Sequence, residues 1–135
     1  MSTNTPLSGA FLVTRYHLRR IYDRAYTEGV SWSIEFSAEV AEWYAELTPS
    51  GSASADRAFD YLAAEGHLLR MPHSRSLGDG LFELRFSCEG VARRVTYEFA
   101  PVRRAILLTT FRKQRDNEKA EVRRARRVQK KGQGR

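Results

Sequence analysis

Residues 79–127 read DGLFELRFSCEGVARRVTYEFAPVRRAILLTTFRKQRDNEKAEVRRARR, and the fold of the chain depends on this stretch. Apolar and polar side chains alternate over residues 82–88 and again over residues 94–99, which is the period of a half-buried strand. A Glu-Gly pair between the two runs favours a hairpin turn. A third run, residues 105–108, is apolar at every position, as a strand buried on both faces would be. The stretch predicts a three-stranded antiparallel meander.

The alternation also separates two faces of the predicted sheet. Successive side chains of a strand point to opposite faces, so the aromatic and aliphatic residues of the first two strands share one face. On the same reasoning Arg85 and Arg94 lie together on the other face, which we expect to be open to solvent. By parity Tyr97 points to the core and is expected to be packed there.

The net charge of +7 is concentrated at one end of the chain. Residues 112–135 contain 11 Lys and Arg against 3 acidic residues, whereas residues 1–111 contain 12 against 13. The segment that follows Asp116 and Asn117, either of which can cap it, reads as a basic helix with a thin apolar stripe at Val122, Ala125 and Val128. Such a patch favours a polyanion, and nucleic acid is the commonest one in a cytoplasm. The alternative is a solvated, fraying C-terminal tail.

Upstream of the meander the chain predicts a strand and two helices. Residues 32–36 alternate as a strand does, and Ser37 is a good N-cap for a helix that ends near Leu47. A second helix is expected over residues 54–65, and residues 67–80, which contain Pro72, read as a loop. The sequence also allows a helix over residues 11–26.

Length and composition fit one soluble domain. The chain has 135 residues, 41% hydrophobic and 29% charged, and no apolar run near the ~20 residues of a membrane span. We therefore expect a cytoplasmic protein without a membrane anchor. The single cysteine, Cys88, reads as a small core residue, and His17 and His67 have no metal-ligand spacing to it. No metal site and no cofactor are predicted.

The segments GLFELRF and RRVTYEF, followed by LLTTFRK at the exit into a basic helix, resemble the RelE/HigB toxins of type II toxin-antitoxin systems. The likeness is to the phage-derived branch of the RelE/ParE superfamily and covers residues 31–131. It implies an α+β fold in which a strand and two helices precede the antiparallel three-stranded meander and the basic C-terminal helix. Residues 1–30 would be an N-terminal extension and residues 132–135 a flexible tail.

The resemblance implies a function and partners as well. It implies a toxin that cleaves mRNA without a metal, often at the ribosome, and so inhibits translation and growth. The implied partner is an antitoxin, often with a helix-turn-helix, encoded nearby. Two alternatives remain open: a ParE-like toxin that inhibits DNA gyrase, and a degenerate, non-catalytic nucleic-acid-binding module.

RNA cleavage by the 2′-hydroxyl needs proton transfer and stabilisation of a doubly charged phosphorane. Arginine suits the second task because its planar fork holds two phosphate oxygens. We therefore predict that Arg94, which matches the arginine of the family's RxxY strand, is catalytic, with Arg85 as its neighbour. Lys113, which matches the lysine of the FxK exit, completes the predicted site. The competing interpretation makes both arginines ordinary strand residues paired with Glu83 or Glu98.

The predicted RNA contacts are four arginines around the last helix: Arg112, Arg115, Arg123 and Arg126. His73 is a weaker candidate for a general base, because a histidine in a loop is usually just solvated. The chain departs from the family pattern at Gln114, where a second lysine is common. Residues 1–30 have no counterpart in the family pattern, which suggests either an over-long gene model or an accessory helix.

Overall fold

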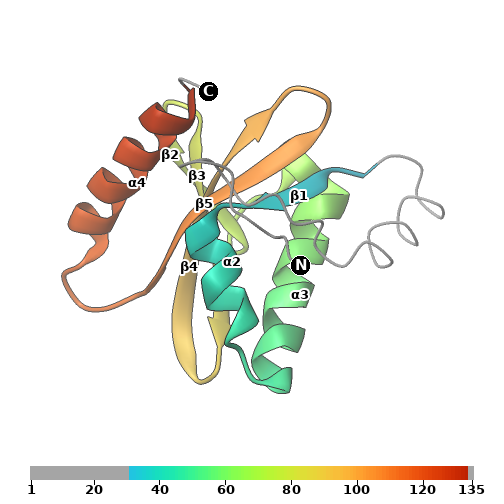
Figure 1. The fold of residues 1–135 in the computed structure, drawn as a ribbon, viewed down its shortest axis with the longest axis vertical. Helices are drawn as coiled ribbons and strands as arrows, with labels where there is room; N and C mark the ends of the chain where they lie inside the picture. The colour runs from blue at the N-terminus through green and yellow to red at the C-terminus, as the bar shows by residue number, and fades with distance from the viewer. Residues whose placement is uncertain (1–30, 134–135) are drawn as a thin grey trace, which may run out of the picture.

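A five-stranded mixed sheet organises residues 31–133, the part of the chain that this computed structural model describes (Figure 1). The elements in chain order are β1 (Ser33–Phe36), α2 (Ala38–Ala45), α3 (Pro49–Glu65), the short 3-10 helix η1 (Gly66–Leu68), β2 (Ser74–Gly78), β3 (Leu81–Cys88), β4 (Val91–Ala100), β5 (Arg104–Arg112) and α4 (Glu118–Gln133). The strand order is β1-β5-β4-β3-β2. β1 runs parallel to β5, and the other pairs are antiparallel.

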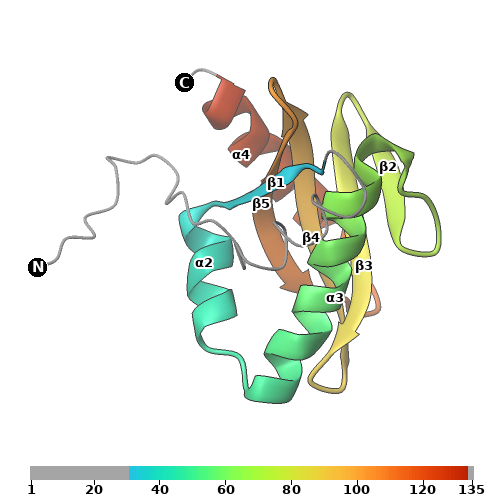
Figure 2. The ribbon, with the colours of Figure 1, turned by 90° about the vertical axis from the view of Figure 1, so that its right-hand side faces the viewer.

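The sheet separates two layers of helices (Figure 2). α2 and α3 cover one face, and the larger core lies there around the ring of Phe59 and the buried alternate residues of the strands. α4 covers part of the opposite face, where Ala125 packs against Leu81, Ile106 and Leu108. β5 is thus buried on both faces, as its apolar sequence predicts.

Local sequence explains where the helices begin and end. Ser37 accepts a hydrogen bond from the Val40 N–H at the start of α2, and Thr48 caps α3 with Pro49 in its first turn. Gly66 ends α3 with a positive φ of 54°, and a Cβ there would lie 2.0 Å from the Trp32 indole nitrogen. Only glycine fits both the backbone conformation and this contact.

The predicted α+β class and the antiparallel meander of β3, β4 and β5 are confirmed. The hairpin turn is confirmed too, with positive φ at both Glu89 and Gly90. The predicted number of strands is wrong, because residues 74–78 form the edge strand β2 rather than a loop. β2 is rich in serine and glycine, and its backbone pairs with β3 without the aromatic alternation that marks a strand in the sequence.

Three boundaries differ from expectation or cannot be compared. α3 begins at Pro49, five residues before the expected start, and α4 continues to Gln133, into the expected tail. The extension over residues 1–30 and its predicted helix lie outside the described residues. Within residues 31–133 no helix is long and apolar enough to cross a membrane.

Candidate functional site

Charged side chains converge where β3, β4 and the start of α4 meet. The β3–β4 ladder pairs Arg85 with Arg94, so both lie on the sheet face that α4 partly covers. Glu83 lies on the same face of β3, two residues before Arg85. We call the five side chains of this group the arginine cluster: Arg75, Glu83, Arg85, Arg94 and Glu118. The predicted neighbourhood of Arg85 and Arg94 is therefore confirmed.

Arg94 is buried within this cluster, with an exposed fraction of 9%. Its Nη1 donates to the carbonyl of Arg93 at 3.1 Å, and its buried Nε finds no hydrogen-bond partner among the described residues. Burial lowers the pKa of Arg94 below the usual value, and the charge of Arg85 lowers it further. The expectation of an open face is wrong at Arg94, because α4 packs on this side of the sheet.

Arg85 is the more accessible member of the pair. Its side chain is 26% exposed, and its Nη1 lies 3.1 Å from Oε1 of Glu83. Arg75 approaches the same oxygen at 3.5 Å and reaches Glu118 at 3.4 Å. The competing interpretation of a strand arginine paired with Glu83 thus describes a real contact. A guanidinium carries five N–H donors, so this contact leaves Arg85 donors for an anion.

Glu83 is a residue whose importance the sequence reasoning missed. It is fully buried, and its Oε2 has no hydrogen-bond partner in the described chain. Burial raises the pKa of Glu83 to about 7, and Glu118 raises it as well, against the opposing charges of Arg75 and Arg94. The sequence does show that Glu83 and Arg85, two residues apart on a strand, lie on the same face. It does not show that α4 buries Glu83.

Lys113 continues the line of β5 beyond its last residue. Its N–H donates to the Ala92 carbonyl at 2.8 Å, so the backbone still pairs with β4. Its Nζ donates to the carbonyl of Gln114 at 2.8 Å. Phe111, two residues earlier, is the cross-strand partner of Arg94, which places Lys113 beyond the arginine cluster at the end of the sheet.

The four predicted RNA-contacting arginines differ in their surroundings. Arg112, Arg115 and Arg123 are exposed. Arg126 instead donates to the backbone carbonyls of Leu77 and Gly78, which fastens α4 to the turn between β2 and β3. Arg126 thus holds the helix on the sheet and has fewer donors left for a ligand.

Arg124 is a second residue that the sequence reasoning missed. Its guanidinium holds the Glu39 carboxylate through two hydrogen bonds of 2.7 and 2.9 Å, and it also bonds Glu121 and the Thr110 carbonyl. These carboxylates raise the pKa of Arg124. A bidentate pair of this kind joins α4 to α2 across the end of β5, which keeps the helix over the arginine cluster.

The remaining candidates have packing roles in the structure. Tyr97 is buried, as predicted, and its hydroxyl shares a hydrogen bond of 2.5 Å with Ser74. The thiol of Cys88 is buried and donates to the Gly51 carbonyl at 3.4 Å. The ring of His73 packs at a tilt against that of Tyr61, outside the arginine cluster. Among residues 31–133 no group of three His, Cys, Asp or Glu could hold a metal ion, and His17 lies outside this range.

The family model described as "Phage derived protein Gp49-like (DUF891)" matches residues 42–130. Because the match covers well over half of the chain, the protein belongs to this phage-derived, toxin-like family, which is related to the RelE/HigB superfamily. The matched range includes the whole arginine cluster and most of α4. Comparison with curated proteins and with solved structures found no match.

Proposed function

We propose that this protein is the toxin of a type II toxin-antitoxin pair and that it cleaves mRNA at the arginine cluster. The observation that carries the proposal is the register of β3 and β4. It holds Arg85 and Arg94 opposite each other, beside the Glu83 carboxyl, whose pKa is about 7. Negative charge builds up on the phosphate oxygens in the transition state of cleavage. Two adjacent guanidinium groups, of which that of Arg85 is partly exposed, can stabilise this charge.

The chemistry divides among the residues by their exposure. In the proposed reaction the 2′-hydroxyl loses its proton and attacks the adjacent phosphorus, and the 5′-oxygen leaves with a proton, giving a 2′,3′-cyclic phosphate. Arg85 contacts the phosphate oxygens, and buried Arg94 adds positive charge from behind. Glu83 orients the Arg85 fork through its 3.1 Å contact. Lys113 is the candidate for holding a phosphate or moving a proton at the edge of the site.

The exposed basic side chains supply the binding surface for RNA. Arg112 and Arg115 flank the entrance to α4, and Arg123 lies on the helix. Contacts of this kind go to phosphates and carry no sequence information, so binding should weaken steeply with salt. Membership of the family suggests a toxin-antitoxin context, and we expect an antitoxin to neutralise this surface. Action at the ribosome in the cytoplasm belongs to the same proposal.

The test is induced expression followed by mapping of transcript ends. We expect growth arrest with new 5′-hydroxyl ends in mRNA, and we expect Arg85→Gln combined with Lys113→Gln to abolish both while the protein stays folded. A fully toxic double variant would show that the site is misassigned. Induction of the DNA-damage response without transcript cleavage would instead support a gyrase inhibitor.

A second candidate is a module that binds nucleic acid without cutting it. The burial of Arg94 and the engagement of Arg85 by Glu83 favour this alternative, because both reduce the positive charge offered to a phosphate. In that case the purified protein would bind single-stranded RNA with strong salt dependence and leave it intact, and expression would be harmless.

A further inference from the structure

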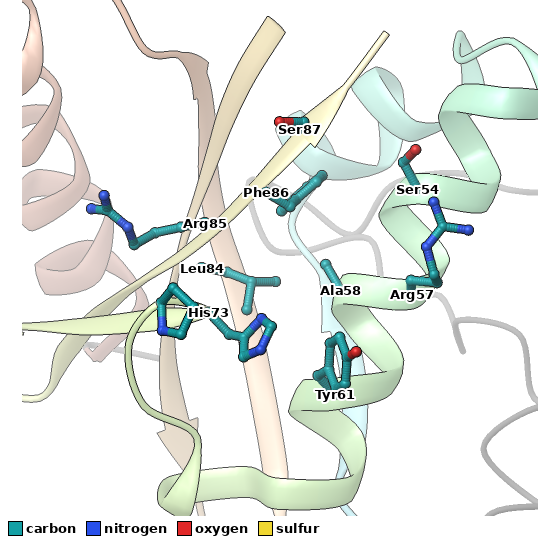
Figure 3. A pocket seen from close by; sticks show the side chains of 10 residues that line it. Ser54, Arg57, Ala58, Tyr61, His73, Leu84, Arg85, Phe86 and Ser87 are labelled. Carbon is teal, nitrogen blue, oxygen red and sulfur yellow. The ribbon is translucent and has the colours of Figure 1, made fainter. Parts of the chain in front are cut away.

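A hollow of about 360 Å³ opens between α3 and the end of β3 (Figure 3). It lies where the edge strand stops: β2 pairs with β3 up to Leu84, and the hollow is lined by the next residues of β3, Arg85, Phe86 and Ser87. Its volume falls at the lower end of the range for small-ligand sites, roughly 300–1,000 Å³. The space suits a single ring system with a short polar attachment.

Two aromatic rings form one wall of the hollow. The rings of Tyr61 and His73 lie 4.5 Å apart with an interplanar angle of 32°. Tyr61 is 47% exposed, and Figure 3 shows its ring beside that of His73. Exposed flat rings of this kind are the platforms on which unpaired bases stack.

The polar lining of the hollow is positive. None of the lining residues is acidic, and Arg57 on α3 is exposed at the side of the hollow near Ser54. Arg85 contributes to the lining, but Figure 3 shows its side chain turned away from α3, toward the side of α4. There it meets Glu83. Arg85 therefore belongs to both sites: its residue lines the hollow next to α3, and its guanidinium lies in the arginine cluster on the α4 side of the sheet.

We propose that this hollow binds one nucleotide of single-stranded RNA, with its base against Tyr61 and His73 and its phosphate on Arg57. The proposal deepens and rests on the proposed function: a strand whose scissile phosphate lies at Arg85 would pass over the edge of β3 and place a neighbouring nucleotide here. The combination of two neighbouring aromatic rings and one arginine favours a nucleotide over an acidic peptide, which would need cations without an aromatic platform.

The experiment titrates the full-length protein with two probes, AMP and a fluorescein-labelled ribohexanucleotide. AMP is followed by amide chemical shifts, and the hexamer by fluorescence anisotropy. Tyr61→Leu and Arg57→Gln are compared with Arg103→Gln, a matched loss of charge on the β4–β5 turn, outside the lining of the hollow. Circular dichroism confirms that each variant is folded.

We expect AMP to shift the amides of Tyr61, His73 and Ser87 saturably. Tyr61→Leu and Arg57→Gln should each weaken hexamer binding roughly tenfold, while Arg103→Gln leaves it unchanged. Wild-type hexamer affinity in both hollow variants, or no saturable shift of these amides with AMP, would overturn the proposal. RNA cleavage is measured separately. Binding in the hollow without cleavage would refute the proposed function alone. Cleavage without AMP-induced shifts and with wild-type hexamer affinity in both hollow variants would refute this inference alone.

Discussion

Arg85 and Arg94 stand opposite each other on β3 and β4, yet their guanidinium groups have different surroundings. Arg85 forms an ion pair of 3.1 Å with Glu83 and keeps a side chain that is 26% exposed. Arg94 is buried and donates to the backbone carbonyl of its neighbour Arg93. Arg85 is therefore placed to contact a ligand at the surface, whereas Arg94 is a fixed charge beneath it. Substitution of the two residues should affect activity and stability differently.

Arg85→Gln should reduce RNA cleavage by about 10²–10³-fold, the usual effect of removing one group that stabilises a transition state. Its melting temperature should change little, because the side chain is partly exposed. Arg94→Gln should lower both activity and melting temperature, since it alters a buried group. Cleavage rates and thermal melts of the two variants check this. Normal cleavage by Arg85→Gln would contradict it, and exposed Arg70→Gln is the control for loss of charge.

Glu83→Gln should change how stability depends on pH. The pKa of Glu83 is about 7 in the folded protein, above its usual value of 4.5, so the folded state holds the proton more tightly. By linkage the wild type loses stability as the pH rises through this window, up to about 3 kcal/mol in total. Glutamine stays neutral, so Glu83→Gln should gain stability relative to wild type between pH 5 and pH 8. Urea unfolding at several pH values measures the difference.

Glu118→Gln is the matched variant for this titration. Glu118 is one of the groups that raise the pKa of Glu83, so Glu118→Gln should lower that pKa. The pH range over which the protein loses stability should then become narrower, but it should not disappear, because burial still raises the pKa of Glu83. Identical pH profiles for the wild type and Glu83→Gln would show that Glu83 titrates normally in the folded protein.

Val102→Asn should stabilise the protein by about 1 kcal/mol. Val102 has a φ of 64° and is 90% exposed on the turn between β4 and β5, a conformation that suits asparagine and strains a β-branched side chain. Val102→Thr keeps the branch and should bring no gain. Thermal melts of the three proteins decide, and equal stability of Asn and Thr would contradict the argument. Cleavage should be unchanged, because the turn lies at the other end of β4 from Arg94.

Strands and helices with a clear periodic pattern of apolar residues could be predicted from the sequence. A strand such as β2, which joins the sheet through backbone hydrogen bonds without such a pattern, could not. The alternation of β3 and β4 predicts that Arg85 and Arg94 share a face, because parity is a local property. Whether that face is open depends on where α4 packs, and nothing in the sequence of β4 specifies this. The strand β2 has no apolar alternation, and the burial of Glu83 likewise follows from tertiary packing.

Arg124→Met should loosen α4 from the sheet. The guanidinium joins Glu39 on α2 to the Thr110 carbonyl on β5, and methionine keeps the aliphatic stem while removing these bonds. The pair is about one-third exposed, so solvent screening limits the cost to about 1–2 kcal/mol. Arg123→Met, at an exposed position on the same helix, should cost less than about 0.5 kcal/mol.

The stability of Arg124→Met and Arg123→Met is measured from their urea unfolding midpoints, and the opening of α4 from its amide hydrogen exchange. Faster exchange confined to α4 in Arg124→Met would show that the helix is fastened over the arginine cluster by this contact. Because α4 covers the face that holds Arg94, the same variant should also make that guanidinium more accessible. Equal exchange in the two variants would mean that the apolar contacts of Ala125 suffice to hold the helix in place.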